Sequence, residues 1–256
     1  MIHPTAIVHE GAQIAEDVEI GPYAIIGEHV KIGSGTTVGP HTVVEGWTEI
    51  GCDNRIFQFA SIGAAPQDLK YRGEKALLKI GDRNTVREFA TLHRGTADGG
   101  GETVVGNDNL FMAYSHVAHD CILGNQVILA NGATLAGHVE VDDFAILGGL
   151  CAVHQFTRIG SHVMISGGSM VTQDVPPFSI AQGDRAKTVG INQIGLKRRG
   201  FSDEAIRGIK QAYKLIFRSG LRTEEALEQI ANEINDCPEV EKFAEFIRKS
   251  ARGVAR

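Results

Sequence analysis

The chain has 256 residues, of which 43% are hydrophobic and 22% charged, and its formal net charge is −6. This composition is typical of a globular protein, and the weakly acidic balance argues against a general nucleic-acid binder. No apolar run approaches the roughly 18 residues that would span a membrane. The first residues, MIHPTAIVHEGA, lack the basic and apolar regions of a signal peptide, so we expect a cytoplasmic location. The four cysteines form no Cys-x-x-Cys pair, and we expect reduced, structural thiols.

Aliphatic side chains recur every six residues through most of the chain. One run extends from Ile2 to Ile62 and resumes at Ile80, and a second run, shifted by one, extends from Val105 to Val171. The residue four places after each lead position is usually small or β-branched. Neither a helix (period 3.6) nor a simple strand (period 2) has this pattern, which is typical of a hexapeptide β-solenoid. Three hexapeptides make one triangular coil, so residues 18 apart are expected to stack.

The solenoid is expected to cover residues 1–186 and to carry the catalytic site. Two segments interrupt the repeat, at residues 63–79 and 95–104, and long loops on a rigid scaffold are where function usually lies. Ile80 follows Ile62 by 18 residues, so we expect the register to be kept across the first loop. The prolines of the segment 174–177 are expected to end the regular coil, because proline lacks the N–H that a β-ladder needs.

Residues 187–256 are expected to form a C-terminal helical domain. Ser202 is a suitable N-cap for a first helix, and Gly220 suits its C-terminal stop. Thr223 is expected to cap a second helix, and Pro238 to begin a third. The apolar residues of these segments recur with helical spacing.

Histidines provide the clearest signal of chemistry. His116, His119, His138 and His154 all lie within three consecutive coils. Gly137 follows His119 by 18 residues, so its backbone should lie one coil away, at roughly the 4.8 Å spacing of stacked strands. An imidazole beside a glycine N–H is the arrangement of a general base next to an oxyanion donor, and Asp120 is placed to support the ring.

Two other interpretations of these histidines stay open at this point. A single histidine in a solenoid turn is usually only solvated, although a cluster favours function. His-x-x-His with a third histidine also resembles a zinc site, as in the gamma-type carbonic anhydrases, which share the hexapeptide solenoid.

Polar side chains elsewhere are candidates for substrate binding. Lys197, Arg198 and Arg199 lie where the solenoid meets the helices and suit a phosphate or pyrophosphate, or else form a solvated helix face. In the first loop, Asp68 and Lys70 lie two residues apart, so one extended backbone presents both to a polar ligand, unless they belong to an ordinary surface loop.

A series of short motifs resembles the UDP-N-acetylglucosamine O-acyltransferase family over essentially the whole chain. The motifs occur in the order QFASIG, QDLKY, IGDRN, TLHRGT, AHDCILGN, LAGHVEVDDFAILGG, AVHQF, QDVPP and GLKRRGFS. The resemblance implies a left-handed parallel β-helix, an exception to the usual right-handed crossovers, and a homotrimer with active sites between neighbouring subunits. It implies transfer of an (R)-3-hydroxyacyl group from acyl carrier protein to the 3-hydroxyl of UDP-N-acetylglucosamine, the first step of lipid A biosynthesis.

The resemblance also implies roles for individual residues. His119 matches the general base, Asp120 its supporting acid, and Gly137 the N–H that stabilises the oxyanion. Matching substrate-contact positions are Asp68, Lys70, His116, His138, His154 and Gln155, and matching nucleotide positions are Asn192, Arg198 and Arg199. Ile194 departs from the glutamate that some relatives carry in the nucleotide region. No metal or cofactor is implied, because the acyl donor is carried on the phosphopantetheine of acyl carrier protein.

The acyl chain is expected to extend from His119 towards the C-terminal coils, where glycines leave room for it. Gly167 matches the position at which relatives measure chain length by side-chain bulk, and a glycine there favours a longer acyl group. We expect Lys70 to act on a site whose base comes from the neighbouring subunit.

Three rival functions remain. The later N-acyltransferase of the same pathway carries an additional N-terminal nucleotide-binding domain, and here the repeat starts at Ile2. A zinc-dependent carbonic anhydrase would contain the metal. A structural or ligand-binding solenoid would need neither the histidine cluster nor the interrupting loops and basic junction.

Overall fold

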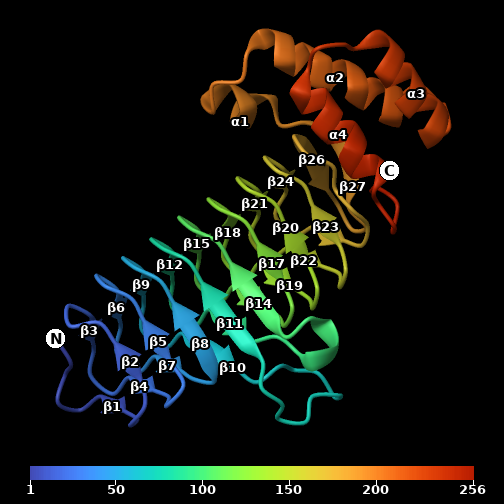
Figure 1. The fold of residues 1–256 in the computed structure, drawn as a ribbon. Helices are drawn as coiled ribbons and strands as arrows, with labels where there is room; N and C mark the ends of the chain where they lie inside the picture. Colours follow the sequence, from blue (N-terminus) through green and yellow to red (C-terminus); the bar gives the residue numbers. More distant parts are fainter.

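The computed structural model describes all residues 1–256, and the repeat forms a triangular prism of stacked coils (Figure 1). Sheet 1 contains β1 (Ile7–Val8), β4 (Ile25–Ile26), β7 (Val43–Val44), β10 (Ser61–Ala64), β13 (Thr91–His93), β16 (His116–Val117), β19 (Thr134–Leu135), β22 (Ala152–Val153) and β25 (Met170–Val171). Sheet 2 contains β2 (Gln13–Ile14), β5 (Lys31–Ile32), β8 (Trp47–Ile50), β11 (Leu77–Ile80), β14 (Glu102–Val105), β17 (Ile122–Leu123), β20 (Glu140–Val141) and β23 (Arg158–Ile159). Sheet 3 contains β3 (Glu19–Ile20), β6 (Thr37–Val38), β9 (Arg55–Ile56), β12 (Thr85–Val86), β15 (Leu110–Phe111), β18 (Ile128–Leu129), β21 (Ile146–Leu147), β24 (Met164–Ile165), β26 (Ser179–Gln182) and β27 (Lys187–Ile191).

The lead residues of the repeat fill the interior of the prism. Val117 pairs with Leu135, and Leu135 with Val153, so residues 18 apart stack as the repeat predicted. These side chains are almost fully buried, within a core of 40 residues. Small residues occupy the second inward position, among them Cys121 and Cys151, which are buried free thiols.

The turns between sheets stack into three edges of the prism. Edge I connects sheet 1 to sheet 2 and includes residues 118–121, edge II connects sheet 2 to sheet 3 and includes residues 124–127, and edge III connects sheet 3 to sheet 1 and includes residues 130–133. One residue in most turns has a positive φ, as at Asp120 (59°) and His138 (61°) on edge I. Non-glycine residues seldom adopt this conformation, and here it bends the chain at each corner.

Both interruptions of the repeat extend from edge I (Figure 1). The first loop spans residues 65–76, and the second spans residues 94–101 with the short helix η1 (Ala97–Gly99). They lie side by side, because Leu77 donates its N–H to Gly101 and the Arg94 guanidinium donates to the Tyr71 hydroxyl. Ile80 pairs with Ile50 on sheet 2, whereas Ile62 pairs with Leu92 on sheet 1. The inward lead position is kept across the first loop, but the expected stacking of Ile80 on Ile62 is wrong, because the loop adds residues to the coil.

Four helices follow the last coil: α1 (Gln193–Arg198), α2 (Asp203–Phe217), α3 (Thr223–Glu233) and α4 (Pro238–Arg248). Ser202 caps α2 and Pro238 begins α4, as predicted. Thr223 is instead the first residue of α3, whose N-cap is Arg222, and α1 was not predicted because six residues are too few to show a helical period. None of the helices has the length and apolar character needed to cross a bilayer.

The junction between solenoid and helices differs from the expected one. Strand β26 lies beyond the two prolines and still pairs in parallel with β24, so the segment 174–177 does not end the stacking. Strand β27 then returns antiparallel to β26. Strand pairing therefore extends past residue 186, and a division of the chain at that residue stays a prediction.

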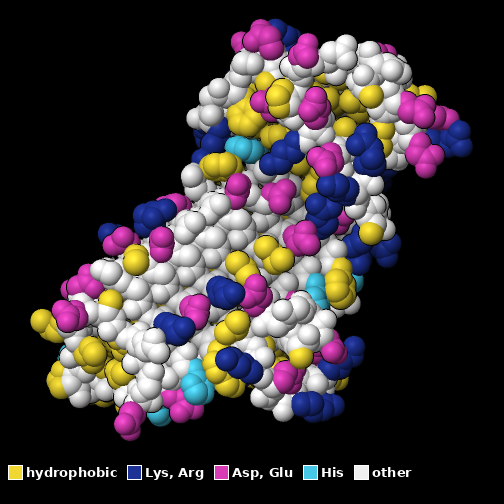
Figure 2. All heavy atoms as spheres, viewed as in Figure 1, with side chains coloured by type: hydrophobic (Ala, Val, Ile, Leu, Met, Phe, Trp, Pro, Cys, Tyr) yellow, Lys and Arg dark blue, Asp and Glu magenta, His cyan; other side chains and the backbone are white.

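The visible surface carries charges of both signs, in keeping with the small net charge. Figure 2 shows Lys and Arg interspersed with Asp and Glu over this face, with hydrophobic side chains gathered at the N-terminal end. No broad single-sign patch of the kind that attracts nucleic acid is visible on it.

Candidate active site

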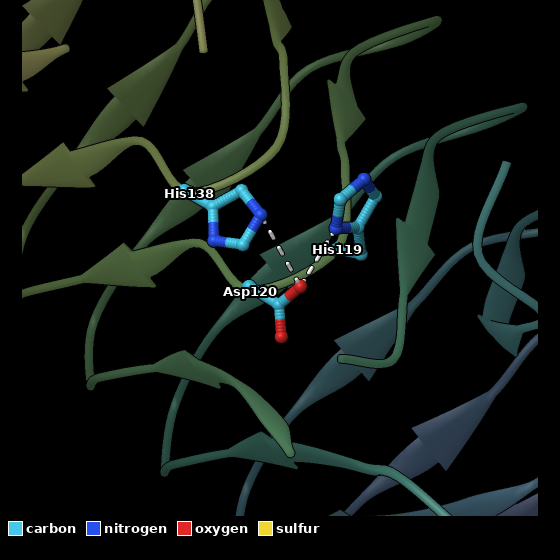
Figure 3. Close-up of side chains that lie close together, drawn as sticks. All are labelled: His119, Asp120 and His138. Carbon is cyan, nitrogen blue, oxygen red and sulfur yellow. Dashed lines mark hydrogen bonds and ion pairs between the residues drawn. The ribbon is translucent and has the colours of Figure 1, made fainter. Parts of the chain in front are cut away.

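His119 and Asp120 form a hydrogen-bonded pair on edge I (Figure 3). His119 Nδ1 lies 2.7 Å from Asp120 Oδ2, and the Asp120 side chain is fully buried. A carboxylate can only accept here, so Nδ1 carries the proton and Nε2 keeps its lone pair. The imidazole is thereby set in the tautomer that a general base requires.

The second loop holds Asp120 in place. Thr96 donates its backbone N–H to Asp120 Oδ1 at 2.8 Å and its hydroxyl to Oδ2 at 2.7 Å. Burial opposes ionisation of the carboxyl group, but the hydrogen bonds from His119 and Thr96 outweigh it and lower the pKa of Asp120. Gly99 of the same loop packs so closely that an added Cβ would overlap the carboxylate. Asp120 is therefore an ionised, immobile partner for the histidine.

Gly137 lies directly against the His119 ring, as the 18-residue spacing predicted. A Cβ added at Gly137 would stand 2.6 Å from His119 Cε1 and 2.8 Å from Nε2, so only glycine leaves room for the imidazole. Gly137 is buried, and its N–H donates to no other group of the chain. A buried N–H without a partner is rare, and this one is free to bind an oxyanion near His119.

His138 completes the group in Figure 3. Its Nε2 lies 3.7 Å from Asp120 Oδ2, and its ring meets the His119 ring edge-on. Phe156 stacks on the other side of His138, with ring centroids 4.4 Å apart. Burial lowers the pKa of His138, although the nearby carboxylates of Asp120 and Asp68 partly oppose this. The ring is accordingly neutral at neutral pH and able to bind a polar substrate group.

His116 lies outside this group, on β16. Its Nδ1 lies 2.6 Å from the Thr91 hydroxyl, and its ring meets that of His93 edge-on at 4.9 Å. Burial, with repulsion from His119, lowers the pKa of His116. Burial also lowers the pKa of His93 to about 4, with smaller effects from His116 and His119.

Three of the remaining candidates on edge I are exposed, and the fourth, Asp68, is half-buried. His154 and Gln155 lie in the turn one coil beyond His138, and Lys70 lies near the tip of the first loop. Asp68 is close enough to His138 to affect its pKa within the same chain. The first loop extends from the same edge as His119, which favours a base from the same chain over the expected base from a neighbouring subunit.

The basic candidates lie on edge II instead. Arg199 stacks on the Phe144 ring at 4.2 Å and donates to Gln126 Oε1 at 2.8 Å. Arg198 and Ile194 are exposed nearby. Asn192 is the N-cap of α1: its Oδ1 accepts from Gly195, and its Nδ2 donates to the carbonyl of His162. Both polar atoms of the Asn192 side chain are thus engaged within the chain.

Gly167 lies on edge III, in the turn between β24 and β25. It is exposed, and Gly149 of the preceding coil lies against it, with the Gly149 carbonyl oxygen 3.1 Å from an added Cβ. Gly167 therefore lies on a different edge of the prism from His119, and the expected path of the acyl chain between them stays a prediction. The base, the arginines and the glycine occupy three different edges of one prism.

A metal ion is a weaker interpretation of the site than an acid–base pair. Ligand atoms of His119, Asp120 and His138 lie within 4.8 Å of one another. However, Asp120 already accepts hydrogen bonds from Thr96 and His119, which need its lone pairs. His116, the first histidine of the expected His-x-x-His pair, points its Nδ1 at Thr91.

Sequence reasoning missed Thr96, which anchors Asp120. Thr96 lies in the string TLHRGT, but the Gly-rich interruption gave no register by which to place it. It also missed His93. This residue lies in the same TLHRGT motif, which supported the family resemblance but suggested no role for the histidine.

Comparisons with known proteins agree with this fold and show the family of the chain. Residues 174–255 match the family described as Udp N-acetylglucosamine O-acyltransferase, Domain 2, and residues 11–46 and 102–137 match the bacterial transferase hexapeptide repeat. The acyl-[acyl-carrier-protein]--UDP-N-acetylglucosamine O-acyltransferase of Janthinobacterium sp. (strain Marseille) is 56% identical over 260 residues, covering 100% of this chain and 99% of that protein.

Solved structures agree along the whole length. LpxA from Acinetobacter baumannii has a TM-score of 0.97 at 48% identity, covering 100% of this chain and 99% of that one. LpxA from Bacteroides fragilis, a UDP-N-acetylglucosamine acyltransferase, has a TM-score of 0.98 at 45% identity, with full coverage of both chains. The predicted fold class, a left-handed parallel β-helix with C-terminal helices, is confirmed. The chain belongs to the UDP-N-acetylglucosamine O-acyltransferase family.

Proposed function

We propose that this protein transfers an (R)-3-hydroxyacyl group from acyl carrier protein to the 3-hydroxyl of UDP-N-acetylglucosamine, the first step of lipid A biosynthesis. One observation carries the proposal: His119, held by Asp120 through Nδ1, packs against Gly137, whose N–H has no partner within the chain. A base and an oxyanion donor in contact are the two groups that acyl transfer to a hydroxyl needs. The names of the relatives supply the two substrates.

In the proposed mechanism, His119 Nε2 takes the proton of the sugar hydroxyl as that oxygen attacks the thioester carbonyl. The N–H of Gly137 donates to the oxyanion that forms, and Asp120 stabilises the imidazolium. The imidazolium then protonates the departing thiolate of phosphopantetheine, and the tetrahedral intermediate collapses to the ester. Atoms balance without a covalent enzyme intermediate, and no metal or cofactor takes part.

Cys121 is not a rival nucleophile, although it follows Asp120 directly. Its thiol is buried in the core, and burial raises its pKa to about 12. Since the thiolate is the reactive form, this cysteine is inert at neutral pH.

The other edge I residues are proposed to bind the reacting ends of the substrates. Lys70 and Asp68 on the first loop face the sugar, and His138 contacts its hydroxyls. His116, His154 and Gln155 line the same side of the prism. All six share the edge of His119 or the sheet beside it, which supports a common site.

We propose that the active enzyme is a homotrimer whose sites combine edges of two chains. Arg199 and Gly167 lie on edges II and III, which flank sheet 3. If edge I of one chain packs against sheet 3 of the next, the arginines reach the nucleotide and Gly167 reaches the acyl tail. Edge III carries exposed aromatic rings that suit such an interface, with Phe59, Phe89 and Tyr114 stacked about 5 Å apart.

Substitution of the base tests the proposal. His119→Ala should lower kcat by roughly 10²–10⁴, because it removes proton transfer in the transition state. Binding of UDP-N-acetylglucosamine, measured by calorimetry, should change little. His9→Ala, an exposed histidine at the N-terminal end, is the matched control. Near wild-type turnover of His119→Ala would refute the assignment.

A further inference from the structure

The C-terminal segment, residues 250–256, returns from α4 to the last coil of the solenoid. The Ser250 hydroxyl donates to Asp174 Oδ2 at 2.7 Å, and Val254 pairs with Asp174 in a parallel β-bridge. Ala255 is only 1% exposed and belongs to the solenoid core. Arg252 lies between these anchors, so its position on edge I is fixed from both sides.

The Arg252 guanidinium reaches a histidine of the candidate active site. Its Nη2 lies 3.2 Å from His154 Nδ1 and 3.3 Å from the Thr172 carbonyl oxygen. Its Nε is buried. The planar group is therefore held against the turn that carries His154, one coil beyond His138.

His154 Nδ1 has two competing partners. The carbonyl oxygen of Gln155 lies 3.0 Å away and can only accept, whereas the guanidinium can only donate. If Nδ1 is protonated, it bonds to Gln155 and Nε2 is an acceptor. If Nδ1 keeps its lone pair, it accepts from Arg252 and Nε2 carries the hydrogen. The two arrangements present opposite hydrogen-bonding groups to a ligand.

We propose that Arg252 is a positioning residue that holds His154 as the Nε2–H tautomer, so that His154 donates a hydrogen bond to an oxygen acceptor of the bound substrate. A protonated Nδ1 would face a permanent positive charge at 3.2 Å, which disfavours that arrangement. The substrate group is a carbonyl, hydroxyl or phosphate oxygen. This inference rests on the proposed function only for the identity of the substrate, because the tautomer is a property of the free protein.

The tautomer is measured directly on the full-length protein. Histidine labelled with ¹⁵N is incorporated, and the spectrum is recorded at about pH 8, where an ordinary histidine is neutral. The His154 signal is identified by its loss in His154→Gln. Wild type should show the Nε2–H form, and Arg252→Ala should shift His154 towards the Nδ1–H form. Arg252→Gln supplies a second variant with a smaller change in volume.

Kinetics then separate positioning from a merely structural role. Arg252→Ala should raise KM about three- to tenfold with little change in kcat, the loss expected for one hydrogen bond. In a His154→Ala background the same substitution should have no further effect, because Arg252 acts through His154. Arg248→Ala, which removes a nearby exposed charge at the end of α4, is the control and should leave KM unchanged.

Either of two results would overturn the inference. One is a wild-type His154 in the Nδ1–H form, and the other is a tautomer that does not respond to Arg252→Ala or Arg252→Gln. Absence of acyl transfer by the wild-type protein would instead count against the proposed function, while the spectra would still decide the tautomer.

Discussion

Asp120 shows how a single residue links the loop, the base and the turn of the site. Its positive φ directs the side chain inward from the corner of the coil, where Thr96 and His119 donate to it. His119 alone would be an ordinary imidazole in a turn. With Asp120 fixed on Nδ1 and Gly137 packed against the ring, its Nε2 is left as the nitrogen for the proposed base.

His93 should make the stability of the protein sensitive to acid. Its pKa is about 4 in the folded state, below the ordinary value of 6.5, because burial disfavours the charged ring. Between these values the unfolded chain binds a proton that the folded chain does not, so stability falls as pH falls through this window. For this histidine the loss is about 2 kcal/mol between about pH 7.5 and about pH 5.

Thermal unfolding of His93→Phe at both pH values measures this contribution. The variant should lose less stability on acidification than wild type, whereas His9→Phe, at an exposed position, should behave as wild type does. An identical acid response of His93→Phe and wild type would show that His93 is not the group responsible.

For individual residues, the sequence predicted contacts between neighbouring coils wherever the hexapeptide repeat kept its register. His119 and Gly137 lie one coil apart, so arithmetic alone placed them together. Thr96 lies in an irregular loop, where no period relates sequence to space. Asn192 illustrates a different limit, because its resemblance to a nucleotide position gave no sign that its Oδ1 caps α1 and its Nδ2 binds the His162 carbonyl.

At the scale of elements, the site depends on turns rather than strands. The strands, most of which have two residues, form the flat faces of the prism. Each edge is a stack of turns, one from each coil. The hexapeptide pattern predicted these faces throughout, because apolar burial repeats with the coil. It did not assign residues to edges, so it gave no sign that His119 and Gly167 lie on different edges.

Gly167 offers a test of the acyl site at this scale. Its φ is not positive, so a side chain is compatible with the backbone there. Gly167→Met should exclude the end of a long acyl chain, and each buried methylene is worth about 0.8 kcal/mol. Loss of two such contacts should lower kcat/KM for the longest donor about tenfold, with shorter donors little affected.

A matched control is Gly190→Met on β27, where an added Cβ meets no atom within 4 Å. It should keep the parent's preference among hydroxyacyl donors. If Gly167→Met also keeps that preference, Gly167 does not limit the acyl site.

At the scale of the whole molecule, the residues of the proposed site lie on separate edges of one prism. His119 lies on edge I and Arg199 on edge II, where Phe144 and Gln126 hold it. A cyclic trimer would unite them at each interface. The resemblance implied a homotrimer, but no pattern within one chain encodes which edges of two chains meet.

Mixed trimers test this arrangement. His119→Ala and Arg199→Ala chains are each expected to be poorly active, and random mixing should restore about a quarter of wild-type activity, since each mixed trimer has one intact site of three. Lys70→Ala mixed with His119→Ala is the control and should not recover, because both residues come from edge I. Recovery in the Lys70→Ala and His119→Ala mixture, without recovery in the His119→Ala and Arg199→Ala mixture, would contradict this arrangement. It would show that Lys70 and His119 of one site come from different chains.

The central claim is acyl transfer to the sugar hydroxyl, and mass spectrometry of the product tests it most directly. Purified protein is incubated with UDP-N-acetylglucosamine and a panel of (R)-3-hydroxyacyl carrier proteins of different chain length. The account predicts a UDP-sugar heavier by one hydroxyacyl group, ester-linked at the 3-position, formed by wild type and nearly absent with His119→Ala. An unmodified sugar nucleotide with every donor, or equal product from His119→Ala, would contradict it.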